Sequence, residues 1–138
     1  MRELELDATL ENLAKVFDFL KEAFDIADMR PRTEREIKMC VEEMYINITR
    51  YAYTPQIGTA TIGFAIDKDN APPRIIITLS DSGKPYDPLQ HEDPDLDLEL
   101  DDMPIGGLGI FLVKETMDSV RYELKNGKNI LTMEKMIV

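Results

Sequence analysis

The 138-residue sequence contains one cysteine, one histidine and 16 basic residues against 27 acidic ones. A single cysteine excludes an internal disulfide, and Cys40 is expected to be a small buried hydrophobe because it falls on the apolar side of a predicted helix. The formal net charge of −11 argues against a nucleic-acid surface, which needs clustered Lys and Arg. It does not argue against a nucleotide, which needs only a local positive site or a metal ion.

Long apolar runs are also missing. No stretch reaches about 18 apolar residues, so no membrane span is expected. The sequence begins Met-Arg-Glu-Leu-Glu, with charges where a signal peptide would be apolar. Together with the lone cysteine, these features predict a cytoplasmic protein. The length and the 43% hydrophobic content predict a single domain over residues 1–138, without repeats or a second domain.

Hydrophobic periodicity predicts an α/β two-layer sandwich. Helical spacing favours three helices, over residues 10–28, 33–53 and 108–118. Alternation favours strands over residues 2–7, 58–67, 74–80, 120–124 and 130–137. Thr33 and Glu36 form a capping box for the second helix, and Asn126-Gly127 is typical of a tight hairpin turn. We expect the three helices on one face of a mixed, mainly antiparallel sheet.

The second helix carries polar residues beside its apolar stripe, which consists of Ile37, Cys40, Val41, Met44, Ile48 and Tyr51. Glu43 and Asn47 are four residues apart on its flank, so their side chains are neighbours, and Arg50 follows on the same flank. Asparagine is a mild cost inside a helix, which invites a functional reason. A carboxylate, an amide and a guanidinium there can serve chemistry, or they can form a solvated helix shoulder.

The strand at 74–80 leads into Asp81-Ser82-Gly83-Lys84-Pro85. An aspartate at the end of a buried strand places a carboxylate at the strand's mouth. A glycine two residues later lets a flat ligand approach the backbone. The alternative is an ordinary turn rich in Asp, Gly and Pro.

Residues 89–105 form an acidic segment with seven Asp or Glu and no Lys or Arg. We interpret it as a lid over a site or as a disordered insertion, and its spacing is not that of an EF-hand. Gly106-Gly107-Leu108-Gly109 then opens the third helix. Backbone N–H groups at a glycine-rich helix start favour an anion such as phosphate. The spacing matches neither a P-loop nor a Rossmann fingerprint.

Three short motifs follow one another in the order of a known family. They are Glu43-x-x-x-Asn47, Asp81-x-Gly83-x-Pro85 and Gly106-Gly107-Leu108-Gly109. Together they resemble the GHKL (Bergerat-fold) ATP-binding module, closest to the anti-sigma-factor serine/threonine kinases, over nearly the whole chain. The resemblance implies ATP and Mg²⁺ as cofactors.

The resemblance also implies a role for each motif residue. Glu43 would be the general base, Asn47 would bind Mg²⁺, and Asp81 would accept a hydrogen bond from the adenine amino group. Gly83 would let the adenine base approach the backbone. Pro85 belongs to the same nucleotide-binding motif. Gly106, Gly107, Leu108 and Gly109 would surround the phosphates.

Two positions depart from the family pattern. Tyr51 stands where the anti-sigma kinases often have histidine, and Arg50 has a basic counterpart in the histidine-kinase branch. Tyr51 can pack near the nucleotide and Arg50 can reach the phosphates. The alternative for Tyr51 is a core aromatic, and the alternative for Arg50 is a surface ion pair. The acidic, glycine-poor lid is also unusual.

We therefore expect a Mg·ATP-dependent serine/threonine protein kinase that phosphorylates a small anti-sigma antagonist protein and sequesters a sigma factor. The family resemblance implies a homodimer, and neither nucleic acid nor membrane is expected as a direct partner. One alternative is an ATP-binding switch without phosphotransfer, against which the presence of Glu43 argues. Another is a detached histidine-kinase catalytic domain, which is disfavoured because His91 is the only histidine.

Overall fold

The computed structural model describes residues 1–69, 71–90 and 107–137. Its strands are β1 (Arg2–Asp7), β2 (Thr59–Asp67), β3 (Arg74–Asp81), β4 (Ser119–Lys125) and β5 (Lys128–Met136). They form one sheet in the order β1-β2-β3-β5-β4, and every described pair is antiparallel. The sheet is thus not mixed within these ranges. β2–β3 and β4–β5 are neighbouring strands that follow one another in the chain, whereas α1 and α2 lie between β1 and its partner β2.

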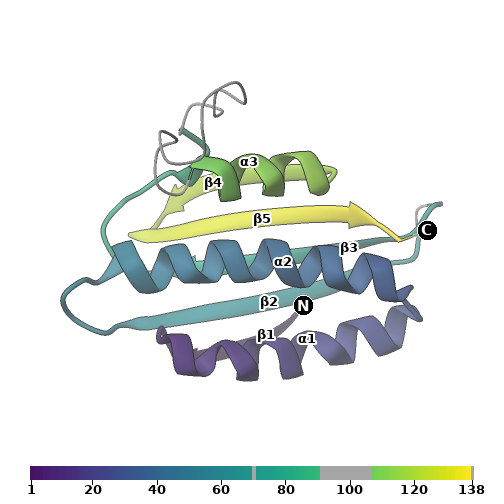
Figure 1. The fold of residues 1–138 in the computed structure, drawn as a ribbon, viewed down its shortest axis with the longest axis horizontal. Coiled ribbons are helices and arrows are strands. Elements are labelled where there is room, and N and C mark those ends of the chain that lie inside the picture. Colours follow the sequence, from purple (N-terminus) through teal and green to yellow (C-terminus); the bar gives the residue numbers. More distant parts are fainter. Residues whose placement is uncertain (70, 91–106, 138) are drawn as a thin grey trace.

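The helices form a second layer on one face of this sheet (Figure 1). They are α1 (Leu13–Ala27), α2 (Pro31–Asn47) and α3 (Gly107–Thr116). Short 3-10 turns flank them at η1 (Leu10–Asn12) and η3 (Pro88–Gln90). The predicted two-layer α/β sandwich is confirmed. Within the described ranges, no helix is long and apolar enough to cross a membrane.

The core lies between the two layers. In β3, side chains alternate between buried and half-buried positions, so Ile75, Ile77 and Leu79 face the helices and Asp81 is the last residue on that inward face. The two-residue alternation of the strand therefore puts the Asp81 carboxylate on the buried face, at its end. β3 pairs with β5 so that Asp81 lies opposite Asn129.

Helix α2 differs from its predicted form at both ends. It begins at Pro31, whose fixed φ suits the first helical position. The predicted capping box fails, because Thr33 is already inside the helix, is only 8% exposed and makes no cap. After Asn47 the chain widens into a π-turn, η2 (Ile48–Ala52), which ends the α-helix before the predicted residue 53.

The π-turn shifts the helical phase. Tyr51 was predicted in the apolar stripe, but its side chain is 41% exposed. Tyr45 is fully buried instead, and its hydroxyl donates a hydrogen bond of 2.6 Å to the Thr9 carbonyl oxygen. A π-turn holds an extra residue per turn, so side chains beyond Asn47 no longer follow the periodicity of α2.

Both predicted hairpins are present. β2 pairs with the whole of β3 from Ala60 to Asp67. β4 and β5 meet at Asn126 and Gly127, whose φ angles of 54° and 76° are those of a tight hairpin turn of the primed kind. The predicted lid, residues 89–105, lies outside the described residues except for Leu89 and Gln90 in η3.

Candidate functional site

A pocket opens between the end of α2, the π-turn η2 and the adjoining ends of β3 and β5. Its lining contains three residues predicted to bind a ligand, namely Asn47, Tyr51 and Asp81. The described residues of the lining are Met44, Asn47, Ile48, Tyr51, Ala52, Leu79, Asp81, Lys84, Tyr86, Pro88, Tyr122, Asn129 and Leu131. An apolar cavity with a few convergent polar groups is the usual form of a small-molecule site.

Asp81 is held by one of its two carboxylate oxygens. Oδ1 accepts hydrogen bonds from the backbone N–H of Gly83 at 2.9 Å and from Asn129 Nδ2 at 3.0 Å. The residue is only 8% exposed. Among described groups, none donates a hydrogen bond to Oδ2, so the carboxylate is fixed in place and keeps an acceptor for a ligand in the pocket that it lines.

Asn129 is a site residue that the sequence reasoning missed. Its Oδ1 accepts from the Tyr86 backbone N–H at 3.1 Å and from the Tyr122 hydroxyl at 2.5 Å. Its Nδ2 donates to Asp81 and, at 2.9 Å, to the Lys84 carbonyl oxygen. The amide is thus fully used and joins the loop after β3 to the terminal hairpin. Asparagine is depleted in strands, so its presence at the start of a strand was the sequence feature that could have marked Asn129.

Gly83 lies against the backbone of the π-turn. A Cβ there would lie 2.3 Å from the Ala52 carbonyl oxygen, and that same oxygen accepts a hydrogen bond from the Lys84 N–H at 2.9 Å. The glycine is thus needed for the loop to dock on η2. Pro85, by contrast, is exposed and borders a separate shallow hollow with Tyr86, Asp87 and Gln90.

Asn47 and Glu43 lie one turn apart on α2, as predicted. Asn47 lines the pocket, and its buried Nδ2 has no hydrogen-bond partner among the described residues. Glu43 is half-buried one turn before Asn47, and its carboxylate meets the first turn of α3: a Cβ at Gly109 would lie 2.1 Å from Glu43 Oε2. The structure therefore brings the first and third motifs together.

The other predicted residues lie either on the π-turn η2 or at the start of α3 and just before it in the sequence. Tyr51 lies at the pocket's edge, where its ring centroid is 5.9 Å from that of Tyr86, and burial raises the pKa of Tyr86 above its usual value. Arg50 is exposed on η2. Gly107 and Leu108 belong to the first turn of α3, whereas Gly106 lies outside the described residues.

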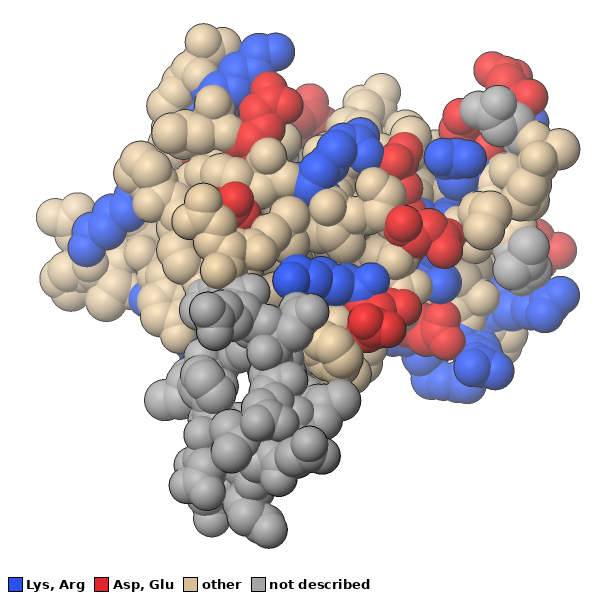
Figure 2. Space-filling model, turned by 90° about the horizontal axis from the view of Figure 1, so that it is seen from above, with Lys and Arg blue, Asp and Glu red and all other residues tan. Residues whose placement is uncertain are grey.

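The charge around the pocket is local rather than broad. Its described lining includes one carboxylate, Asp81, and one ammonium group, Lys84. On the face shown in Figure 2, Lys and Arg alternate with Asp and Glu instead of gathering into one basic surface. A polyanion such as nucleic acid is attracted by the field of a broad positive surface. The mixed surface here instead favours a small ligand held by specific contacts.

The antiparallel sheet covered by three helices, with a fixed aspartate at the end of a buried strand, is built by a sequence that matches the histidine kinase-like ATPase domain. The sequence model of that family matches residues 6–135, and the chain belongs to this family. The chain is similar to serine/threonine-protein kinase BtrW of Bordetella bronchiseptica, with 31% identity over 97 residues, 70% of this chain and 66% of that protein.

Two further comparisons agree. Serine-protein kinase RsbW of Staphylococcus epidermidis is 31% identical over 134 residues, which cover 93% of this chain and 82% of that protein. Among solved structures, that of the RsbU and RsbW domains of Rv1364c from Mycobacterium tuberculosis superposes with a TM-score of 0.66. The superposition covers 99% of this chain and 33% of that chain at 15% identity, so this comparison supports the fold.

Proposed function

We propose that this chain binds Mg·ATP and transfers the γ-phosphoryl group to a serine or threonine of a small anti-sigma antagonist protein. One observation carries the proposal: the carboxylate of Asp81 is fixed through Oδ1 and keeps Oδ2 for a donor in the pocket. The family membership and the relatives named as serine kinases support it.

The nucleotide base is assigned to the pocket that Asp81 lines. The amino group of adenine is a donor and suits the Oδ2 acceptor, whereas guanine offers a carbonyl oxygen at the equivalent ring position and would be repelled. The apolar walls formed by Ile48, Leu79 and Leu131 suit a flat heterocycle. Tyr51 can pack against the nucleotide from the pocket's edge.

Asn47 is the residue assigned to Mg²⁺. Its side chain lines the pocket, and the amide oxygen is the atom that would bind Mg²⁺. The buried Nδ2 is a donor without a partner among the described residues, which suits a phosphate oxygen rather than the metal. The described ranges contain no cluster of three or more His, Cys, Asp or Glu that could hold a metal ion. Mg²⁺ commonly takes part of its oxygen shell from the phosphates and, when bound, would offset their charge, so Asn47 need supply only one of its ligands.

Glu43 is the base in this proposal. Its carboxylate accepts the proton of the acceptor hydroxyl as the hydroxyl oxygen forms a bond to the γ-phosphorus. The bond from that phosphorus to the β–γ bridging oxygen breaks, and ADP leaves with the electron pair. Phosphate contacts are assigned to Gly106, to Gly107 and Leu108 at the start of α3, and to Arg50 on η2.

We extend the proposal to the protein's setting. By resemblance, the chain forms a homodimer in the cytoplasm, where it holds a sigma factor in one state of the antagonist and thereby regulates transcription. The resemblance of the three motifs to the anti-sigma-factor kinases supports this setting, and the relatives named as serine kinases support its kinase part.

Phosphotransfer tests the proposal directly. The purified protein is incubated with γ-labelled ATP, Mg²⁺ and each small candidate antagonist encoded near its gene. We expect label on a serine or threonine of one candidate with wild type and a loss of about 10²-fold or more with Glu43→Ala. ATP binding without transfer to any candidate would instead favour a nucleotide-dependent switch.

A further inference from the structure

The contact between Glu43 and Gly109 gives this glycine a purpose separate from phosphate binding. Gly109 lies in the first turn of α3, and a Cβ there would lie 2.1 Å from Oε2 and 2.7 Å from Cδ of Glu43. Non-bonded carbon and oxygen atoms do not approach so closely. Alanine is a better helix former than glycine, so glycine at this helical position requires a reason, and the Glu43 carboxylate supplies one.

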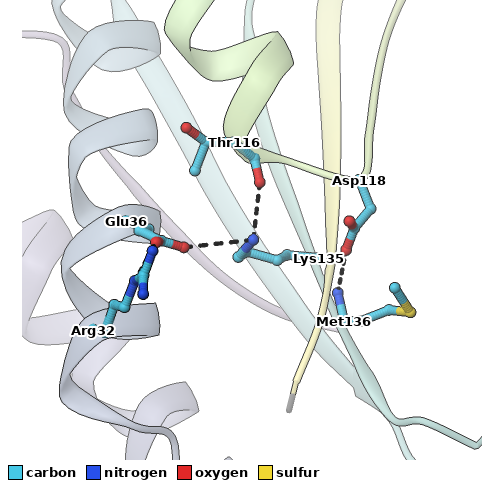
Figure 3. A network of polar contacts seen from close by, with 6 residues as sticks. All are labelled: Arg32, Glu36, Thr116, Asp118, Lys135 and Met136. Carbon is cyan, nitrogen blue, oxygen red and sulfur yellow. Dashed lines mark hydrogen bonds and ion pairs between the residues drawn. The ribbon is translucent and has the colours of Figure 1, made fainter.

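Helix α3 is fastened at its other end, so it cannot easily withdraw from Glu43. Lys135 Nζ donates to the Thr116 carbonyl oxygen at 2.8 Å and lies 3.5 Å from Glu36 Oε2 on α2 (Figure 3). Just beyond the helix, the Met136 N–H donates to Asp118 Oδ2 at 2.6 Å. Strand β5 thereby holds the end of α3 against α2.

The core face of α3 adds to this restraint. Ile110, Val113 and Met117 are at most 4% exposed, and a packed core resists displacement of the backbone. The Glu43 side chain, in contrast, ends in a carboxylate on rotatable bonds. A methyl group added at Gly109 would therefore move the carboxylate rather than the helix.

We infer that Gly109 is a positioning residue for Glu43: the missing side chain lets α3 pack on the carboxylate and thereby fixes its place between α2 and α3. The catalytic part of this inference rests on the proposed function, in which Glu43 is the base. Its structural part does not, because it concerns only where the carboxylate lies.

Gly109→Ala should separate turnover from binding. We expect ADP formation from Mg·ATP, with water as acceptor, to fall at least about tenfold because a displaced base is a poor base. The Kd for Mg·ATP should change less than about twofold, and the melting temperature should not fall. Glu115→Ala, on the exposed side of the same helix, is the matched control and should leave all three values unchanged.

Second-site variants test whether Gly109 acts through Glu43. In the Glu43→Ala background the carboxylate is gone, so Gly109→Ala should cause no further loss of turnover. In Glu43→Asp the side chain is one methylene shorter, so Gly109→Ala should cost less than it does in wild type. Such non-additivity is the signature of a pair that acts as a unit.

A crystal structure of Gly109→Ala decides the structural part whatever the activity. Displacement of the Glu43 carboxylate with α3 in place supports the inference. An unmoved carboxylate, or a shift of α3 instead, overturns it, as does a loss of ATP affinity equal to the loss of turnover. Failure of the proposed function looks different: Glu43→Ala would turn over ATP as fast as wild type.

Discussion

Asp81 and Asn129 work as one unit at the scale of single residues. Asp81 ends the buried row of β3, and its register partner on β5 supplies an amide whose donors and acceptor are all used. A buried network in which every member is satisfied fixes its side chains strongly, and removal of one member leaves the others unpaired. The orientation of the Asp81 carboxylate, which we propose binds adenine, therefore depends on a residue that faces it from another strand.

Asn129→Ala is expected to weaken both folding and nucleotide binding. It removes the acceptor of the Tyr86 N–H and of the Tyr122 hydroxyl and the donor to the Lys84 carbonyl, so we expect a loss of about 2 kcal/mol in the free energy of unfolding. The Kd for ATP should rise at least about tenfold, because Asp81 can then turn. Urea denaturation and calorimetry measure the two effects. Thr132→Ala, on the other face of β5, is the control, and an unchanged ATP affinity in Asn129→Ala would contradict this account.

Cys40 gives a prediction that depends on pH. Burial raises the pKa of its thiol from the usual 9.0 to about 11. Below pH 9 the thiol is protonated in both the folded and the unfolded chain. Between about pH 9 and 11 it ionises only in the unfolded chain, so the free energy of unfolding falls as pH rises, by about 2 to 3 kcal/mol in total. Cys40→Ala should lack this component, and equal slopes for both proteins in urea titrations across this range would refute it.

At the scale of elements, the sequence predicted the existence and order of helices and strands better than their ends. Long amphipathic periods and the Asn126-Gly127 turn are strong signals, and both survive in the structure. The start of α2 was misplaced because proline at the first helical position outweighs a capping box two residues later. The π-turn has no clear sequence signature, so the exposure of Tyr51 could not be foreseen.

The candidate site shows the same division. Residues within short motifs, such as Asp81 and Asn47, could be found from the sequence and do line the pocket. Asn129 could not, because its importance comes from a strand register that joins distant parts of the chain. Gly83 was found, but its backbone neighbour, the Ala52 carbonyl, depends on the π-turn. Their roles in nucleotide binding stay predictions.

Gly83→Ala tests the docking of the loop on the π-turn. The added methyl would lie 2.3 Å from the Ala52 carbonyl oxygen, which is backbone and cannot rotate away. The loop must then shift, with loss of the Lys84 N–H bond to that oxygen. We expect a loss of about 1 to 3 kcal/mol in unfolding free energy and at least about tenfold weaker ATP binding. Ser82→Ala, exposed one residue earlier, is the control; if Gly83→Ala behaved like it, the loop would not be docked as described.

At the scale of the whole molecule, three helices cover one face of the sheet, and no described helix covers the other (Figure 1). The proposed homodimer predicts a mass in solution of about twice the chain's 15.8 kDa. Sedimentation equilibrium across a range of protein concentrations measures it. A single species of chain mass at the highest concentration would rule the dimer out, while the account of the pocket would stand unaffected.

The central claim is that a fixed aspartate at the end of β3 makes this pocket a Mg·ATP site. Isothermal titration calorimetry with ATP, with and without Mg²⁺, tests it most directly on wild type, Asp81→Asn and Glu43→Ala. We predict that wild type binds ATP well only with Mg²⁺, that Asp81→Asn loses most of this affinity, and that Glu43→Ala keeps it. Wild type that binds no ATP under either condition, or Asp81→Asn that binds as tightly as wild type, would contradict the account.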